Sequence, residues 1–438
     1  MSTVTDQTSQ QPSGPTPAMD AEHTHVRPKV GLKTPVVYAL AAVASLLLLL
    51  GVEAGQRTTF QLGTASDFIT IPNIGVPSMV TIVVLAVIMA AAAVWAFLQV
   101  RQRVPAPAWL HALVGLAFVL AFLTFAGAGK SSVVPMVSLL QGAVMLSVPL
   151  VFGALSGVVC ERSGIINIAI EGQLLFGAFA AAVVASAVGS GYAGLIAAPI
   201  AGAMVGGLLA WFAVMYRVNQ IIIGVVLNTL IMGLTGFLFS TVLAQNKAVW
   251  NTRMPLPRIK IPGLADIPLI GPVLFNQTIL VYLMYVIIIV LNFMLFRSRW
   301  GLRTRAVGEH PKAADTVGIK VNPRRVWNTI LGGAIAGLGG AFFTVGSGLA
   351  FGRDMSAGNG FIALAAMILG KWNPWGAVAA ALLFGFSKNL GNMLSTIGSG
   401  VPPELLIALP YLITIFAVAG FVGRVRPPAA EGIPYTKS

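Results

Sequence analysis

The chain has 438 residues, of which 57% are hydrophobic and only 9% are charged, and its mean hydropathy is +0.87. Soluble globular domains average about 45–50% apolar and about 25% charged residues, so this composition excludes a soluble protein and indicates a membrane protein. The formal net charge of +14 could suggest a nucleic acid polymer as partner, but the basic residues flank apolar segments instead of forming a soluble basic face, which argues against that class.

Blocks of about 20 apolar residues, separated by short polar connectors, predict an all-α fold: a polytopic membrane helical bundle. A spanning β-barrel would instead need alternating segments of about 10 residues. The predicted spans are, in chain order, residues 34–52, 78–99, 108–127, 133–157, 171–188, 192–215, 221–243, 277–296, 326–348, a short 360–370, 375–392 and 404–423, or about 11–12 helices. Most of the 27 Lys and Arg residues then fall on one side, which predicts that both termini are cytoplasmic.

The run from 360 to 370 needs a separate interpretation, because about ten helical residues rise only about 15 Å. Ser356, Gly358 and Asn359 precede this run and Gly370 ends it. We therefore expect a half-helix whose broken backbone is buried by protein or lines a cavity, as is typical of solute sites in transporters. An ordinary helix with wider bounds is the alternative.

Charged residues are concentrated in the stretch CERSGIINIAIEG, which begins at Cys160. Glu161 and Arg162 are predicted at the cytoplasmic end of a span, and Gly164 is expected to break the helix. Glu171 opens the next span, where a carboxylate stabilises the positive end of the helix dipole by about 0.3–1 kcal/mol. The stretch is either an interfacial ion pair with an N-terminal carboxylate or a conformationally coupled element.

A second concentration of charge, RSRWGLRTRAVGEHPKAADTVGIKVNPRR, begins at Arg297. Pro311 suits the first position of a helix, residues 312–317 make about two turns, and Gly318 follows where a left-handed cap is expected. A short, stiff helix in a basic cytoplasmic loop can pass force to a soluble partner. A positive-inside loop with an incidental helix is the alternative.

Four ordered motifs carry a resemblance to a known family: Glu161–Gly164, NIAIEG at 167–172, RAVGEHPKAADTVGI at 305–319 and GFIALAAMILGKWNPWGA at 360–377. With GIPYTK at 432–437, they resemble the permease subunit of binding-protein-dependent ABC importers of the branched-chain amino acid and ribose permease superfamily, nucleoside permease type. The resemblance begins near residue 133. It divides the chain into a disordered cytoplasmic tail (1–33), additional N-terminal transmembrane helices (34–132), a permease core (133–424) and a cytoplasmic C-terminal tail (425–438).

The resemblance implies a transport subunit in a prokaryotic cell membrane that forms the translocation pathway for nucleosides. No enzymatic activity, catalytic residue, metal or cofactor is expected in this chain. The implied partners are an ABC ATPase subunit, a second permease subunit, an extracytoplasmic substrate-binding protein and membrane lipid. The residues implied for coupling to the ATPase are Arg305, Gly308, Glu309, His310, Pro311, Ala314, Asp315 and Gly318.

Polar side chains inside spans are costly in lipid and usually face the bundle or a cavity. The candidates for the substrate pathway are Asn167, Glu171, Gln173, Asn228, Thr229, Ser387 and Asn389, each of which could instead form an interhelical hydrogen bond. Arg253, Arg258 and Lys260 lie in a predicted external loop and could meet carboxylates of a binding protein. The alternative is that a long translocated loop simply ignores the charge rule.

GAGKSS at 127–132 is not a phosphate-binding loop, because Thr124 stands where that motif needs glycine. ATP hydrolysis is therefore expected in another chain. GxxxG spacing predicts close helix packing at three pairs, Gly153 and Gly157, Gly202 and Gly206, Gly333 and Gly337. The alternative functions are an ABC permease for a simple sugar or a branched-chain amino acid and, from another class, an ion-coupled secondary transporter.

Overall fold

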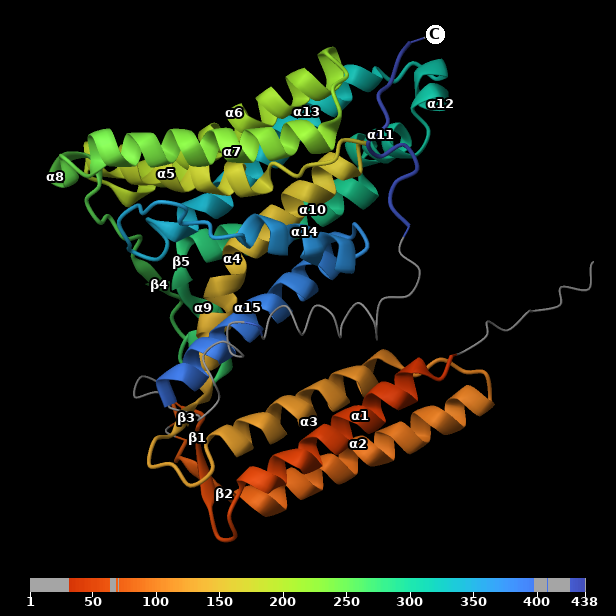
Figure 1. Ribbon diagram of the computed structural model, residues 1–438, viewed down its shortest axis with the longest axis vertical. Coiled ribbons are helices and arrows are strands. Elements are labelled where there is room, and N and C mark those ends of the chain that lie inside the picture. The colour runs from red at the N-terminus through yellow and green to blue at the C-terminus, as the bar shows by residue number, and fades with distance from the viewer. Residues whose placement is uncertain (1–30, 64–67, 70, 398–407, 409–425, 438) are drawn as a thin grey trace, which may run out of the picture.

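The computed structural model describes residues 31–63, 68, 69, 71–397, 408 and 426–437 (Figure 1). Within these residues, ten helices are long and apolar enough to cross a membrane, and one further apolar helix is shorter. The predicted polytopic helical bundle is therefore confirmed. The predicted span 404–423 lies outside the described residues, apart from Ala408.

The spanning helices lie close to the predicted segments, although the predicted span 326–348 corresponds to a helix at 321–340. They are α1 (Lys33–Leu47), α2 (Ser78–Arg101), α3 (Ala108–Ala126), α4 (Met136–Glu161), α5 (Ile170–Val188), α6 (Gly191–Ala210), α7 (Gln220–Leu238), α10 (Ile279–Arg297), α13 (Val321–Gly340) and α15 (Pro374–Ile397). Short 3-10 turns extend α1 (Leu48–Gly51) and α13 (Ala341–Phe343), and π-helical turns extend α6 (Trp211–Met215) and α7 (Phe239–Leu243).

The shorter elements lie between or outside these spans. They are the helices α8 (Lys247–Trp250), α9 (Ile270–Phe275), α11 (Arg299–Glu309), α12 (Pro311–Thr316) and α14 (Asn359–Leu369). Strand β1 (Arg57–Gln61) pairs antiparallel with β2 (Ile74–Pro77) and parallel with β3 (Val134–Pro135), and β4 (Arg258–Lys260) pairs antiparallel with β5 (Asn276–Thr278). Helix α11 was not expected from the sequence, because its arginines indicated a cytoplasmic loop.

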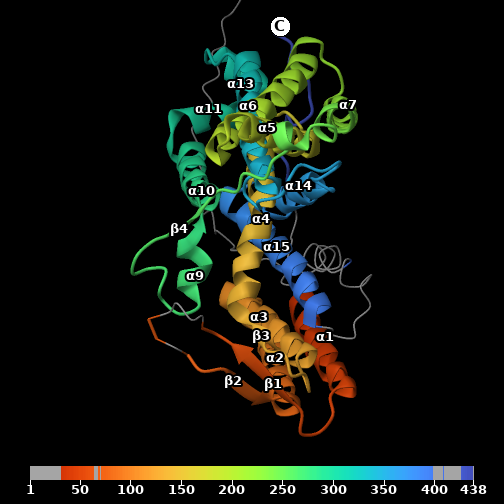
Figure 2. The same ribbon diagram turned by 90° about the vertical axis from the view of Figure 1, so that its left-hand side faces the viewer.

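Helices α1, α2 and α3 form a three-helix unit at one side of the molecule (Figures 1 and 2). Tyr38, Met89 and Leu110 are buried at its centre. The small β1–β3 sheet connects this unit to the rest of the chain, and a second apolar cluster packs Leu123 of α3 with Leu390 of α15. The unit is therefore attached to the remaining helices at one end.

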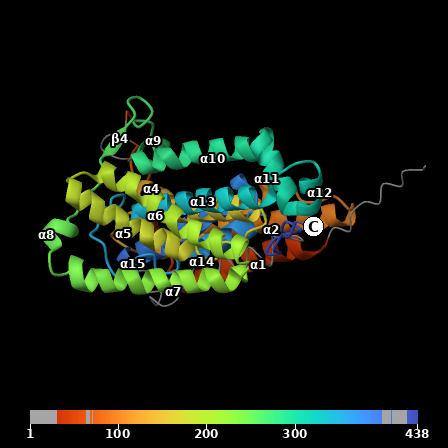
Figure 3. The ribbon, with the colours of Figure 1, turned by 90° about the horizontal axis from the view of Figure 1, so that it is seen from above.

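Helices α6 and α13 pack main chain against main chain through their glycines. A side chain added at Gly202 would collide with the backbone of Gly333 and Gly337, and one added at Gly206 would meet the backbone of Thr329 and Gly333. Seen from above, α5, α6 and α13 lie between α7 and α10 (Figure 3). The GxxxG spacing thus marks the centre of the bundle, as predicted.

The pair Gly153 and Gly157 on α4 also permits close packing, in this case against the shorter helix α14. Side chains added there would collide with Ala363 and Met367 of α14. Cys160, near the end of α4, is fully buried with its Sγ 3.9 Å from the carbonyl oxygen of Asn328 on α13. Close packing on both sides of α4 fixes α14 and α13 around it.

Candidate functional site

The segment between α4 and α5 turns back into the protein. Gly164 has φ 91°, a left-handed conformation that favours glycine, and Ile165 and Asn167 are fully buried. The Asn167 Nδ2 donates to the hydroxyl of Ser156 at 3.0 Å, and Ser156 lies more than one turn before the end of α4. Helix α5 therefore begins inside the bundle.

Glu171 lies in the first turn of α5, yet its carboxylate caps a different helix. Oε1 accepts a hydrogen bond from the Gly358 N–H at 2.8 Å, and Oε2 accepts one from the Gly360 N–H at 2.6 Å. Both donors belong to the N-terminal end of α14, whose first N–H groups have no partner within the helix. A carboxylate is the acceptor that a helix N-terminus favours, so Glu171 fixes the start of the half-helix.

Lys388, in the second half of α15, brings a cation to the same region. Its Nζ lies 3.2 Å from the Asn359 Oδ1 at the start of α14. The Asn359 amide also donates to the Ser356 carbonyl at 2.5 Å. The sequence analysis named the neighbours Ser387 and Asn389 and missed Lys388, although a charged residue within an apolar span is itself a signal of function.

Buried amide side chains form hydrogen bonds that stabilise the non-helical segment between α4 and α5. Asn167 and Gln173 form a reciprocal pair at 3.0 and 3.1 Å, and both are fully buried. Asn228 of α7 accepts from the Gly172 N–H at 2.8 Å and donates to the Ile168 carbonyl at 2.9 Å. Irregular backbone at membrane depth needs such partners. In this arrangement the amides bind protein, and their contact with a solute stays a prediction.

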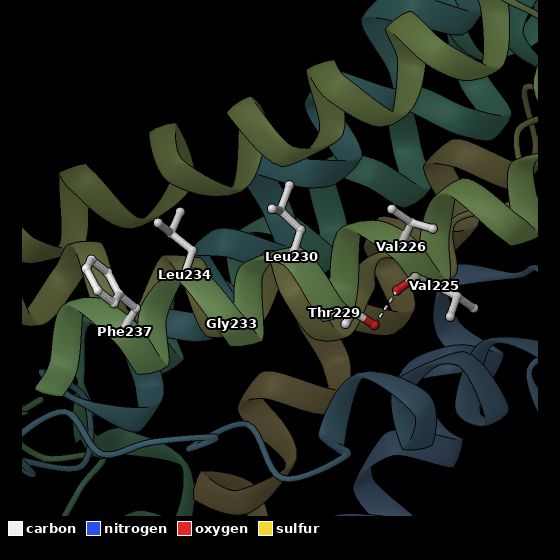
Figure 4. Close-up of a pocket in the computed structure, with 7 residues that line it drawn as sticks. All are labelled: Val225, Val226, Thr229, Leu230, Gly233, Leu234 and Phe237. Carbon is white, nitrogen blue, oxygen red and sulfur yellow. Dashed lines mark hydrogen bonds between the residues drawn. The ribbon is translucent and has the colours of Figure 1, made fainter.

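The three remaining pathway candidates lie apart from these amides. Thr229 lies on the exposed face of α7, where its hydroxyl donates to the Val225 carbonyl at 3.1 Å (Figure 4). Ser387 is buried and donates to the Leu383 carbonyl, and the Asn389 Nδ2 donates to the Leu139 carbonyl of α4 at 2.8 Å. The open groove around Thr229 is otherwise lined by Val225, Val226, Leu230, Gly233, Leu234 and Phe237.

The other end of α14 is tied to the end of α4 through Trp372. The indole Nε1 of Trp372 donates to the Glu161 Oε2 at 2.6 Å, and the Arg162 Nε donates to the Trp372 carbonyl at 3.0 Å. Glu161 is 2% exposed and Trp372 is 5% exposed. An acidic residue beside the α4–α5 turn therefore holds each end of the half-helix.

The predicted cytoplasmic helix is present as α12. Pro311 is its first residue, and Gly318 follows it with φ 82°, as the sequence predicts. Ala314 is buried against Val307 of α11, whereas His310 and Lys312 are exposed. One face of α12 therefore packs on the protein and the opposite face is open to a partner.

The other coupling candidates lie on or next to α11. Gly308 is buried, and a side chain there would collide with the carbonyl of Arg162. The guanidinium carbon of Arg305 lies 5.3 Å from the centre of the Phe296 ring. The Glu309 Oε2 accepts a hydrogen bond from the Ala429 N–H at 3.3 Å. The structure thus brings these candidates together beside the α4–α5 turn.

The basic residues predicted to be external lie on one surface loop. Arg253, Arg258 and Lys260 are all exposed. Lys260 forms an ion pair with Asp266, and an Arg258 nitrogen lies 4.0 Å from the sulfur of Met145. Among the residues that the structure describes, no group of three or more His, Cys, Asp or Glu side chains could hold a metal ion.

Ten apolar spanning helices, a half-helix that begins inside the bundle and the short helices α11 and α12 between two spans are the features of a membrane permease. Residues 139–418 match the family described as branched-chain amino acid transport system / permease component. The chain belongs to this family. The match begins within α4, so α1 to α3 precede it.

The relatives of the chain are permease proteins of ABC transporters. It is 38% identical over 317 residues to the guanosine ABC transporter permease protein NupQ of Bacillus subtilis, covering 70% of this chain and 98% of the relative. It is 37% identical over 305 residues to the nucleoside ABC transporter permease protein NupC of Lactococcus lactis, covering 67% and 95%. It is 31% identical over 308 residues to the putative glucose ABC transporter permease protein TsgC13 of Haloferax volcanii, covering 66% and 92%. No solved structure matches the chain.

The chain is therefore a permease subunit of an ABC transporter and a multi-pass protein of the cell membrane. It is a transport component, as its relatives are. Membership in the family implies an ATPase and a substrate-binding protein as partners.

Proposed function

We propose that this permease forms the translocation pathway for nucleosides in an ABC importer and that a separate ATPase subunit powers it. The observation that carries the proposal is the identity of 37–38% to a guanosine permease and a nucleoside permease, across at least 95% of both relatives. The 31% identity to a putative glucose permease supports a simple sugar as second candidate.

A second permease subunit is proposed to complete the pathway. A further Bacillus subtilis relative, the guanosine ABC transporter permease protein NupP, is 29% identical to this chain, so that organism holds two related guanosine permeases. The exposed face of α7 supports this proposal, because only 22% of the residues in the most apolar 18-residue stretch of this span are buried within the chain.

The solute is proposed to pass the N-terminal end of α14. Glu171, Asn359 and Lys388 bring an anion, an amide and a cation together there. A nucleoside is neutral and presents hydroxyl groups and base edges, which such a mixed polar surface can bind. Asn167, Gln173 and Asn228 would then act mainly by holding the broken backbone in place.

The outward face of α12 is proposed to dock on the ATPase, and Arg253 and Arg258 are proposed to meet carboxylates of the binding protein. Replacing residues 308–315 by a flexible linker tests the first of these roles. Uptake should be lost while the protein still inserts, because a flexible segment absorbs motion instead of passing it on. Unchanged uptake would refute the role of α12.

The substrate is tested in liposomes that contain this permease with its partner permease and ATPase, and with binding protein added outside. The measured quantities are ATP-dependent uptake of guanosine, glucose and leucine, each labelled. Saturable uptake of guanosine alone is expected. Uptake of glucose alone would show that the substrate is a sugar and not a nucleoside. Uptake by the isolated chain with only an ion gradient would refute ATP coupling.

A further inference from the structure

The C-terminal segment, residues 426–437, lies beside α11 and α12, and we name it the strap (Figure 1). We propose that the strap joins α12 to the α4–α5 turn, residues 162–169, so that motion of α12 moves the turn and the half-helix. This inference rests on the coupling role proposed above for α12. It gives a role to the C-terminal residues, including those of the GIPYTK stretch.

The strap is attached to α11 and α12 at three points. The Ala430 N–H donates to the Gly308 carbonyl at 2.9 Å, and the Ala429 N–H donates to the Glu309 Oε2 at 3.3 Å. Tyr435 is 8% exposed and packs in one apolar cluster with Ala314 of α12. Its hydroxyl interacts with the Asp315 carboxylate.

The same segment is attached to the α4–α5 turn. The Gly432 N–H donates to the Gly164 carbonyl at 3.1 Å. Arg325 of α13 links the two segments, because its Nε donates to the Ser163 carbonyl at 3.1 Å and its Nη1 donates to the Ile433 carbonyl at 2.7 Å. Arg325 is 1% exposed, so these charge-assisted hydrogen bonds are shielded from water.

The strap also comes close to the residues that hold the end of α14. The Glu431 carboxyl is near enough to the Glu161 carboxyl for the two groups to interact electrostatically, and Glu161 accepts the hydrogen bond from Trp372. Burial raises the pKa of Glu431. A continuous set of contacts therefore runs from Ala314 of α12, through the strap, to the α4 end of the α4–α5 turn.

The strap matters because α12 is weakly held without it. The helix has six residues, and only Ala314 among them is buried. A helix with so little buried surface can tilt without moving its neighbours. Tyr435 covers Ala314 and so connects α12 to the segment that binds Gly164.

The test compares Tyr435→Ala with Ile433→Ala in the assembled transporter. The Ile433 side chain is 55% exposed, and its carbonyl, which accepts from Arg325, remains in the alanine variant. For Tyr435→Ala we expect solute transported per ATP hydrolysed to fall at least about fivefold while the ATPase stays bound, since coupling energies of this size are usual. Ile433→Ala should stay within about twofold of the unchanged protein by the same reasoning.

Hydrogen–deuterium exchange supplies a second readout that a purely local role of Tyr435 would not change. In Tyr435→Ala the amides of α12 and of residues 162–169 should both exchange faster. Faster exchange in α12 alone, or an unchanged transport ratio, would overturn the proposal. If Tyr435→Ala does not fold, Asp315→Asn provides the same two measurements with the aromatic ring in place.

These outcomes separate the strap from the substrate. If the unchanged transporter does not carry guanosine, the nucleoside proposal fails. Exchange in residues 162–169 still decides whether the strap connects α12 to the turn.

Discussion

The three-helix unit and the helices that follow it are both apolar bundles, but they are packed differently. In α6 and α13, glycines bring main chain against main chain. In the three-helix unit the contacts are made by side chains such as Tyr38 and Met89, and a side chain added at Gly115 of α3 would meet nothing within 4 Å. In the most apolar 18-residue stretch of α4, 89% of the residues are buried. The corresponding share in α2 is 33%.

The difference teaches where the fold tolerates change. Helices α6 and α13 of the family region pack at backbone distance, where a single added methyl group has no space. The three-helix unit leaves most of its surface for lipid or another partner. Each prediction below tests one side of this comparison.

The largest effect is expected from Gly337→Leu. The added side chain would collide with the Ala198 carbonyl and the backbone of Gly202, so α6 and α13 cannot stay together. We expect no monodisperse protein in size-exclusion chromatography after detergent extraction. Gly115→Leu is the matched control and should elute like the unchanged protein. A normal elution profile for Gly337→Leu would show that the bundle can open at this contact.

A large loss of transport is expected from Glu171→Ala. The substitution leaves the Gly358 and Gly360 N–H groups without their acceptor, and an unsatisfied buried donor costs about 1–3 kcal/mol. The initial rate of ATP-dependent uptake should fall by about tenfold or more. Glu171→Gln keeps one acceptor oxygen, so its uptake rate should lie between those of Glu171→Ala and the unchanged protein. Equal rates for Glu171→Ala and for the control Glu53→Ala, at an exposed glutamate, would contradict the capping role.

A smaller effect is expected from Leu123→Ala, where the three-helix unit meets α15. Leu123 is fully buried and packs with Leu390 and Leu394. Truncation of a buried leucine costs about 2–5 kcal/mol in soluble proteins, so the temperature of unfolding should fall. Uptake per folded molecule should stay unchanged, since the unit lies outside the family region. Loss of uptake in folded protein would show that the unit takes part in transport.

The smallest effect is a pH dependence at Glu431. Burial raises the pKa of this carboxyl above its ordinary value of 4.5, so the attached strap keeps a proton that a free strap would release. Attachment is therefore strongest at low pH and weakens as the pH rises through the window between the two pKa values. Amide exchange in residues 429–433, corrected for intrinsic rates, should be slowest below the ordinary carboxyl pKa of 4.5 and become faster as the pH rises above it. Glu431→Gln should remove this difference, and a variant that keeps it would assign the titration to another group.

The sequence predicts the spans well because each is a long apolar block, and long apolar blocks have one physical solution in a membrane. The half-helix was also predictable, since Gly358 and Gly370 bound a run too short to cross. The α4–α5 turn was harder. Residues 165–170 are apolar apart from Asn167 and would fit an ordinary link. Only contacts with Ser156 and Asn228, distant in sequence, show that the turn is inside the bundle.

The roles of charged residues were the least predictable part of the site. Glu171 has the sequence position of a cap for its own helix, yet it caps α14, which is 187 residues further along the chain. The strap has glycine, proline and no apolar run, so its sequence does not reveal that Tyr435 and the backbone of Gly432 find partners. Such pairings depend on tertiary contacts, which a local pattern does not contain.

Cys160 makes the molecule convenient for chemical labelling. It is the single cysteine of the chain, and no part of it reaches the surface. A maleimide dye added to intact cells or to inverted vesicles should not label the unchanged protein. A cysteine placed at Lys312 or at Arg253 would then be the one reactive thiol, and the sidedness of each loop could be read from which preparation becomes fluorescent.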